Sequence, residues 1–161
     1  MRMLLASLAL LLAGCGFSPM YAPANGGAAI GPVQVSMIEG KAGHVLKTEL
    51  DRILAVERDA GTPPMQLEIR LAEQIVGLGI RLNESASRAE LRLIANYILT
   101  PASGQPLRGS VNSVVVYDVP DAAFGEITAQ DDARERAAET LAQRMRAELA
   151  LRVAQARPSG A

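Results

Sequence analysis

The chain has 161 residues, a length that suits a single domain with its own hydrophobic core. Its 16 Lys and Arg residues nearly balance 17 Asp and Glu residues, and the formal net charge of −1 argues against a nucleic-acid partner, which usually requires a basic surface. A single cysteine excludes an internal disulfide.

Residues 1–14 have the layout of an export signal. Arg2 supplies a positive charge ahead of an apolar run that continues to Gly14. A helix of this length reaches only ~16 Å, about half of the ~30 Å hydrocarbon core of a bilayer, so the run is too short to remain as a membrane span. No later apolar run approaches the ~18 residues that a transmembrane helix needs. We therefore interpret residues 1–14 as a signal peptide and expect no transmembrane helix after it.

The sequence Leu12-Ala13-Gly14-Cys15 resembles the bacterial lipobox, in which the cysteine sulfur receives a diacylglyceryl group before cleavage on its amino side. Cys15 is the only cysteine and lies where this motif requires it, which favours lipid attachment over a buried or redox-active thiol. Several acyl chains hold a protein on a membrane almost permanently. Residue 16 is Gly rather than the Asp that marks inner-membrane retention in many lipoproteins, so the resemblance implies the periplasmic side of the outer membrane.

Residues 15–32 form the predicted lipidated tether, because prolines and glycines interrupt any regular pattern there. After it, alternating apolar and polar side chains predict a short strand over residues 33–37. Over residues 44–58, apolar side chains recur at helical spacing with charges on the other faces, which predicts an amphipathic helix. Its apolar stripe consists of Val45, Leu46, Leu50, Ile53 and Leu54.

The central part of the chain has the alternation of β-strands. Residues 65–71 alternate strictly between apolar and polar side chains. Residues 75–82 either prolong this strand, with a bend at Gly77 and Gly79, or form an apolar loop. Two further strands are predicted over residues 91–99 and 107–117, each preceded by a turn, over residues 83–87 and 100–106.

A second helix is predicted from Thr128 to Val153, because Thr128 and Asp131 have capping-box spacing and apolar residues then recur on one face. Alanines in its buried stripe indicate close approach to the sheet or to the other helix. Residues 156–161 are predicted to be a disordered tail. The order of elements predicts an α+β two-layer sandwich over residues 33–155, with two helices packed on one face of a roughly four-stranded mixed sheet (order β-α-β-β-β-α).

No set of side chains in the sequence meets the needs of an enzyme active site. His44 is the only histidine and lies at a predicted helix start, and with Cys15 acylated no Cys/His metal set can form. Gly77-Leu78-Gly79 lacks the third glycine of a dinucleotide fingerprint. We therefore expect neither an enzyme nor a metal or cofactor, and we predict that the tethered domain binds a partner at the membrane.

The mature start Cys15-Gly16-Phe17, with Pro19 and Tyr21, resembles that of the LptE family of lipopolysaccharide-assembly lipoproteins. Further matches are Leu46, Leu50 and Leu54, the strand Leu67-Ile69-Leu71, Arg88, the strand with Ala95, Tyr97 and Leu99, Ser110, Tyr117 and the final helix near Arg146 to Leu149. Phe124-Gly125 departs slightly, since family members often have alanine after the aromatic residue. The resemblance implies a plug inside the outer-membrane β-barrel LptD, which helps that barrel assemble and helps lipopolysaccharide reach the outer leaflet.

Direct contact with the phosphates and acidic sugars of lipopolysaccharide would need clustered Arg or Lys side chains. The candidates are Arg81, Arg88, Arg92 and Arg108. Arg81 and Arg88 would converge if the turn between them is a hairpin tip. The alternative is that all four are ordinary solvated charges.

A second function also stays open at this point, an auxiliary lipid- or ligand-binding lipoprotein of an ABC-type envelope transport system. That function requires an apolar cavity of ~300 Å³ or more, which residues 75–82 could line.

Overall fold

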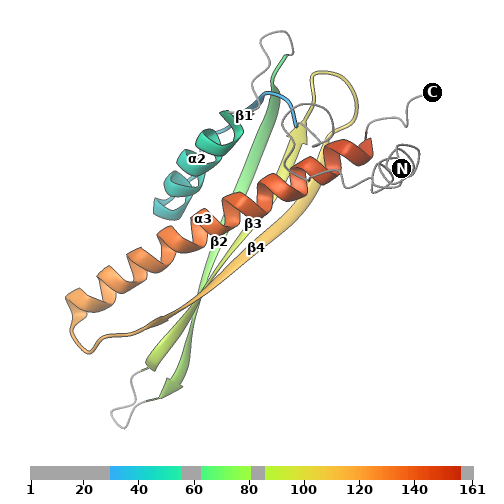
Figure 1. The fold of residues 1–161 in the computed structure, drawn as a ribbon. Coiled ribbons are helices and arrows are strands. Elements are labelled where there is room, and N and C mark those ends of the chain that lie inside the picture. Colours follow the sequence, from blue (N-terminus) through green and yellow to red (C-terminus); the bar gives the residue numbers. More distant parts are fainter. Residues whose placement is uncertain (1–29, 56–62, 81–85, 157–161) are drawn as a thin grey trace, which may run out of the picture.

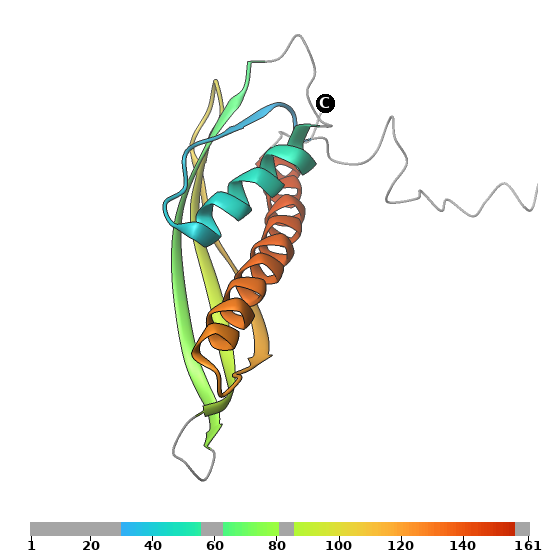
Figure 2. The ribbon, with the colours of Figure 1, turned by 90° about the vertical axis from the view of Figure 1, so that its left-hand side faces the viewer.

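The computed structural model describes residues 30–55, 63–80 and 86–156. Figure 1 shows a four-stranded sheet and two helices, in the order strand, helix, three strands, helix. Both helices lie on the same face of the sheet (Figure 2). The α+β two-layer sandwich predicted from the sequence is therefore confirmed. The predicted signal peptide, Cys15, the predicted tether up to residue 29, Arg81 and the predicted tail beyond Ala156 lie outside the described residues.

The sheet is mixed, and its strands lie side by side in chain order: β1 (Val33–Val35), β2 (Met65–Ile80), β3 (Ala86–Thr100) and β4 (Leu107–Asp118). β1 runs parallel to β2, and the other two pairs are antiparallel. The register places Leu67 opposite Leu99 and Tyr97 opposite Gly109. Within each of the two hairpins the register does not shift along the strands.

Residues 75–80 prolong the strand rather than forming a loop. β2 continues to Ile80 and pairs with β3 along its length, with Gly77 opposite Ala89. Gly79 has a φ of 73°, a left-handed conformation that glycine adopts without strain. The hairpin of β2 and β3 consequently extends past the start of the last helix (Figure 1).

Both helices begin earlier than the sequence predicted. α2 spans Lys41–Leu54 and follows Gly40, whose φ of 83° again requires glycine. α3 spans Ala123–Ala156. Thr128, the expected N-cap, lies inside α3, where its hydroxyl donates to the carbonyl of Phe124 at 3.0 Å. Threonine bonds to the carbonyl one turn earlier as well as capping, so the capping-box spacing placed the start too late.

The core lies between the helices and the sheet, and β3 is its centre. The fully buried leucines and methionine are Leu46, Leu50, Leu54, Leu67, Leu91, Leu93, Leu99, Leu141, Met145 and Leu149. α3 approaches β4 closely through fully buried alanines, as predicted. At this approach the buried hydroxyl of Ser113 donates to the carbonyl of Ala137 at 2.8 Å, which satisfies the polar group inside the core.

The opposite face of the sheet has no described helix over it (Figure 2). It presents the even-numbered residues of β2, β3 and β4, among them Arg70, Asn96 and Arg108. We call this surface the open face. Near the end of the β2–β3 hairpin, Val76 and Leu78 are 55% and 37% exposed. Neither described helix combines the length and the apolar character needed to cross a membrane.

Candidate functional site

The three candidate arginines that the structure describes share the open face, but two of them already have partners. On β3, Nε of Arg88 lies 3.0 Å from Oδ1 of Asp118, its register partner on β4. Nη2 of Arg92 lies 2.7 Å from Oε1 of Glu90 on the same strand. A neighbouring carboxylate compensates each of these charges, so they attract a further anion less strongly than an unpaired arginine would.

Arg108 on β4 differs, because it forms no ion pair within the described part of the chain. Arg108 lies opposite Ile98 of β3, two residues along that strand from Asn96, which itself lies opposite Arg70 of β2. Arg70 likewise has no ion pair among the described residues. Both arginines line one hollow of about 590 Å³ on the open face, together with Asn96, Ile98 and Glu68.

Arg70 is a residue that sequence reasoning missed. The strict alternation over residues 65–71 already placed its side chain on the solvent side of a strand. The missing signal was the register, which brings β2 and β4 to the two sides of β3 and so places Arg70 and Arg108 in the same hollow. The hollow offers two guanidinium groups, an amide and one carboxylate, a set that can hold a phosphate or an acidic sugar by charge-assisted hydrogen bonds.

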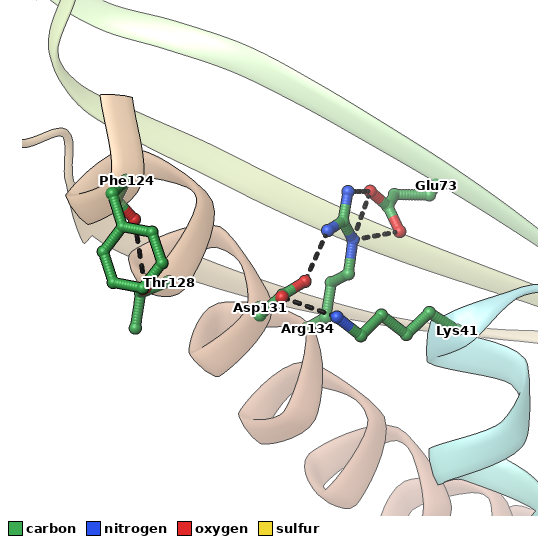
Figure 3. A network of polar contacts seen from close by, with 6 residues as sticks. All are labelled: Lys41, Glu73, Phe124, Thr128, Asp131 and Arg134. Atoms are coloured by element: carbon green, nitrogen blue, oxygen red, sulfur yellow. Dashed lines mark hydrogen bonds and ion pairs between the residues drawn. The ribbon is translucent and has the colours of Figure 1, made fainter. Parts of the chain in front are cut away.

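A second group of charges holds the two layers together. Figure 3 shows Lys41 of α2, Glu73 of β2, and Asp131 and Arg134 of α3 in one network. Nη2 of Arg134 lies 2.8 Å from Oε1 of Glu73, and its Nη1 lies 2.9 Å from Oδ1 of Asp131. The hydrogen bond from Lys41 lowers the pKa of Asp131 below its ordinary value. All four charges are matched within the network, which therefore positions α2, α3 and β2 rather than binding a ligand.

The remaining polar groups have structural surroundings. His44 is exposed on α2, and its carbonyl accepts the hydroxyl of Thr48 at 3.0 Å. The Tyr97 hydroxyl donates to Oε1 of Glu148 at 3.5 Å, and burial raises the pKa of this tyrosine. Across the described segments, no three His, Cys, Asp or Glu side chains gather as a metal site would require.

The fold and this surface can be compared with known proteins. The family model for LptE, whose description is lipopolysaccharide-assembly, matches residues 30–149, a range that holds every described strand, α2 and most of α3. The chain belongs to the LptE family. The resemblance stated from the sequence is thus confirmed, and LptE-family proteins are non-enzymatic lipopolysaccharide-assembly lipoproteins.

Solved structures share the LptE fold. A candidate lipoprotein from Caulobacter crescentus CB15 is 30% identical with a TM-score of 0.59, and the match covers 82% of this chain and 96% of that one. A minor lipoprotein from Acinetobacter baumannii is 14% identical with a TM-score of 0.58, covering 75% and 95%. Rare lipoprotein B from Shewanella oneidensis is 14% identical with a TM-score of 0.51, covering 76% and 98%. The last two show the shared fold alone. No curated protein matches the chain.

Proposed function

We propose that this LptE-family protein is anchored to the periplasmic side of the outer membrane through acylated Cys15 and plugs an LptD-like β-barrel. In that position it assists assembly of the barrel and delivery of lipopolysaccharide to the outer leaflet. The observation that carries the proposal is the family match over residues 30–149, which begins a short segment after the lipobox-like sequence ending at Cys15.

The shape of the domain is compatible with a plug. A strand rises ~3.3 Å per residue, so the 16 residues of β2 extend over roughly 50 Å, similar to the ~40–45 Å of a bilayer with its headgroups. The outer surfaces of both layers carry charged and polar side chains, and the interior of a wide membrane barrel is polar. The elongated sandwich can therefore lie along a barrel lumen, although it also exposes some apolar side chains, such as Val76 of the hairpin and Val116 of β4.

The sequence feature that favoured the second function, an auxiliary lipoprotein of an ABC-type system, has a different role in the structure. That function used residues 75–82 as the lining of an apolar cavity, whereas Ile75, Val76 and Leu78 are exposed on the projecting hairpin. We therefore retain the barrel plug as the proposed function.

Co-purification tests the plug. The full-length acylated protein, extracted from its native membrane in mild detergent with an affinity tag, is expected to bring a large β-barrel protein with it in a near-equal amount. Mass spectrometry of the eluate measures the companion and its stoichiometry. An eluate that holds bound lipid but no barrel would contradict the plug and would support the auxiliary lipid-binding lipoprotein instead.

Within this function, we propose that lipopolysaccharide contacts Arg88, Arg92 and Arg108 on the open face, together with Arg81, which lies outside the described residues, and that Arg108 with Arg70 contributes most. Two observations support this order. The guanidinium groups of Arg70 and Arg108 line one hollow and lack carboxylate partners within the described segments. Arg88 and Arg92 would have to give up or share an existing ion pair to bind an anion.

Neutralising the unpaired arginines is expected to weaken lipopolysaccharide binding more than neutralising the paired ones. A charged hydrogen bond contributes about 1.5–3 kcal/mol, so R70Q/R108Q is expected to weaken binding by about tenfold or more. The matched double variant R88Q/R92Q removes the same charge from the same face and is expected to lose less. Titration of the purified protein with fluorescent lipopolysaccharide measures both. Equal losses would overturn the order, and unchanged binding in both variants would overturn the site.

A further inference from the structure

β4 forms one edge of the sheet, and no described element covers its outer side. Hydrogen bonds at the opposite edge of the sheet show which residues turn their main-chain groups toward which neighbouring strand. There the amide of Met65 donates to the carbonyl of Pro32, and the amide of Ser36 donates to the carbonyl of Leu67. Odd-numbered residues of β2 thus point their main-chain groups toward β1. In both antiparallel pairs, even-numbered residues face even-numbered residues and odd face odd. The even-numbered residues of β2 therefore bond to β3, and the odd-numbered residues of β3 bond to β4. The even-numbered residues of β4 are left with their main-chain NH and CO groups directed away from the sheet.

A hydrogen bond at this edge agrees with that phase. Nη1 of Arg144, on α3, donates to the main-chain carbonyl of Asn112 at 2.9 Å. The outward groups of β4 therefore begin at residue 108 and end at residue 118, with Ser113 at their midpoint. An edge of this length is a template for pairing with another strand.

The outward residues are self-complementary in charge. Arg108 lies at one end and has no ion pair among the described residues. Asp118 lies at the other end, where its Oδ1 pairs with Arg88 of β3 while 80% of its side chain stays exposed. Its second carboxylate oxygen can accept a further cationic donor. If a second β4 runs antiparallel about a two-fold axis at Ser113, Arg108 of each copy meets Asp118 of the other. The same arrangement pairs Asn112 with Val114 and Ser110 with Val116. A register shifted by two residues shortens the ladder and leaves both of these charges without their partners, because one then faces a neutral residue and the other faces a position beyond the end of the strand.

Apolar surface also borders this edge. A hollow of about 630 Å³ lies beside β4, lined by Val111 and Asn112 of β4 and by Ala147 and Leu151 of α3. Leu151 is 53% exposed, and Val114 and Val116 on the open face are 42% and 47% exposed. A second copy seated on the edge would cover these side chains, and the burial of apolar surface adds to the main-chain bonds.

We infer that β4 is a homodimer seam, in which two copies of this chain pair antiparallel about Ser113 to form one continuous sheet. In the monomer, Arg144 blocks part of this edge, because its guanidinium donates to the carbonyl of Asn112. In the dimer, that carbonyl would instead accept from the amide of Val114 of the other copy. Dimerisation therefore requires this side chain to move away. The inference does not depend on the proposed plug, since it concerns the protein without barrel or lipopolysaccharide.

Sedimentation of the full-length acylated protein in excess detergent, freed of lipopolysaccharide, tests the seam. The wild-type protein is expected to dimerise with rising concentration. R108D places two aspartates opposite each other at both ends of the seam, and D118R places two arginines there. Each variant therefore replaces two attractions by two repulsions and is expected to weaken the dimer about tenfold. R144A is expected to tighten it. R70D removes an equally unpaired arginine from the open face, two strands from the seam, and is expected to leave the dimer affinity unchanged.

Mixing the two variants gives the decisive result. In a heterodimer of R108D with D118R, both ends of the seam again join opposite charges, so the mixture is expected to recover wild-type affinity although each variant alone does not. This recovery depends on the antiparallel register and is not expected from a general effect on folding. A protein that stays monomeric at every concentration, or a mixture no tighter than its components, would overturn the inference.

Discussion

Replacing Cys15 by serine is expected to remove all attached lipid and to deplete the protein from the outer-membrane fraction. The reason is that the thioether needs a thiol, and the chain has no other cysteine to supply one. Each buried methylene of an acyl chain contributes about 0.8 kcal/mol, and chains in combination are what make anchoring stable. Intact-mass measurement of protein made in a native host, together with density fractionation of its membranes, checks both effects.

A matched control moves the thiol without removing it. The double variant C15S/S18C keeps the composition but places the cysteine three residues beyond the lipobox-like segment, and it is expected to stay unacylated. Wild-type protein that carries a free thiol and retains residues 1–14 would contradict the anchor. The localisation proposed for the domain would be lost with it.

Gly109→Val is expected to lower the free energy of unfolding by about 3 kcal/mol, a large overpacking cost for a single core-facing substitution. A β carbon at Gly109 would lie 2.5 Å from the hydroxyl oxygen of Tyr97 and 2.6 Å from Cζ of its ring. Tyr97 is 2% exposed and is held by packing and by Glu148, so the ring has no free space to enter. Chemical denaturation of the purified protein measures the change.

Two comparisons separate this close contact from a general effect on β4. Ser110→Val introduces the same side chain one residue along, on the exposed open face, where valine suits a strand, and it is expected to be nearly neutral. In a Tyr97→Leu background the obstructing ring is gone, so Gly109→Val is expected to cost less by about 1 kcal/mol or more. Additive losses would show that Tyr97 is not the source of the strain.

The two-layer arrangement could be predicted from the sequence, because the spacing of apolar residues indicates which face of each helix and strand is buried. The alternation of Leu67 and Ile69, and of Leu91 to Leu99, placed one face of each strand correctly. The alanine stripe of α3 predicted close approach to the sheet or to the other helix, and the bond from Ser113 of β4 to Ala137 shows the approach to the sheet. Element ends were less predictable, since Thr128 has capping-box spacing but bonds inside the helix.

The candidate site was only partly predictable, because charge pairing is a property of the register. Arg88 and Asp118 are 30 residues apart in sequence and become direct neighbours only when β3 and β4 align. Arg70 and Arg108 are brought to one hollow by the strand that lies between their own. A linear pattern identifies a positive side chain on an exposed face but not the carboxylate that already occupies it.

The parallel pairing of β1 with the start of β2, and the return of α3 toward that same end, place both exits of the domain together. The end of the β2–β3 hairpin lies at the opposite pole, roughly 50 Å away along β2. A fluorophore or affinity handle attached at the end of α3 is therefore held away from that hairpin. Such a fusion leaves the distal pole free for labelling and for capture of whatever the molecule meets there.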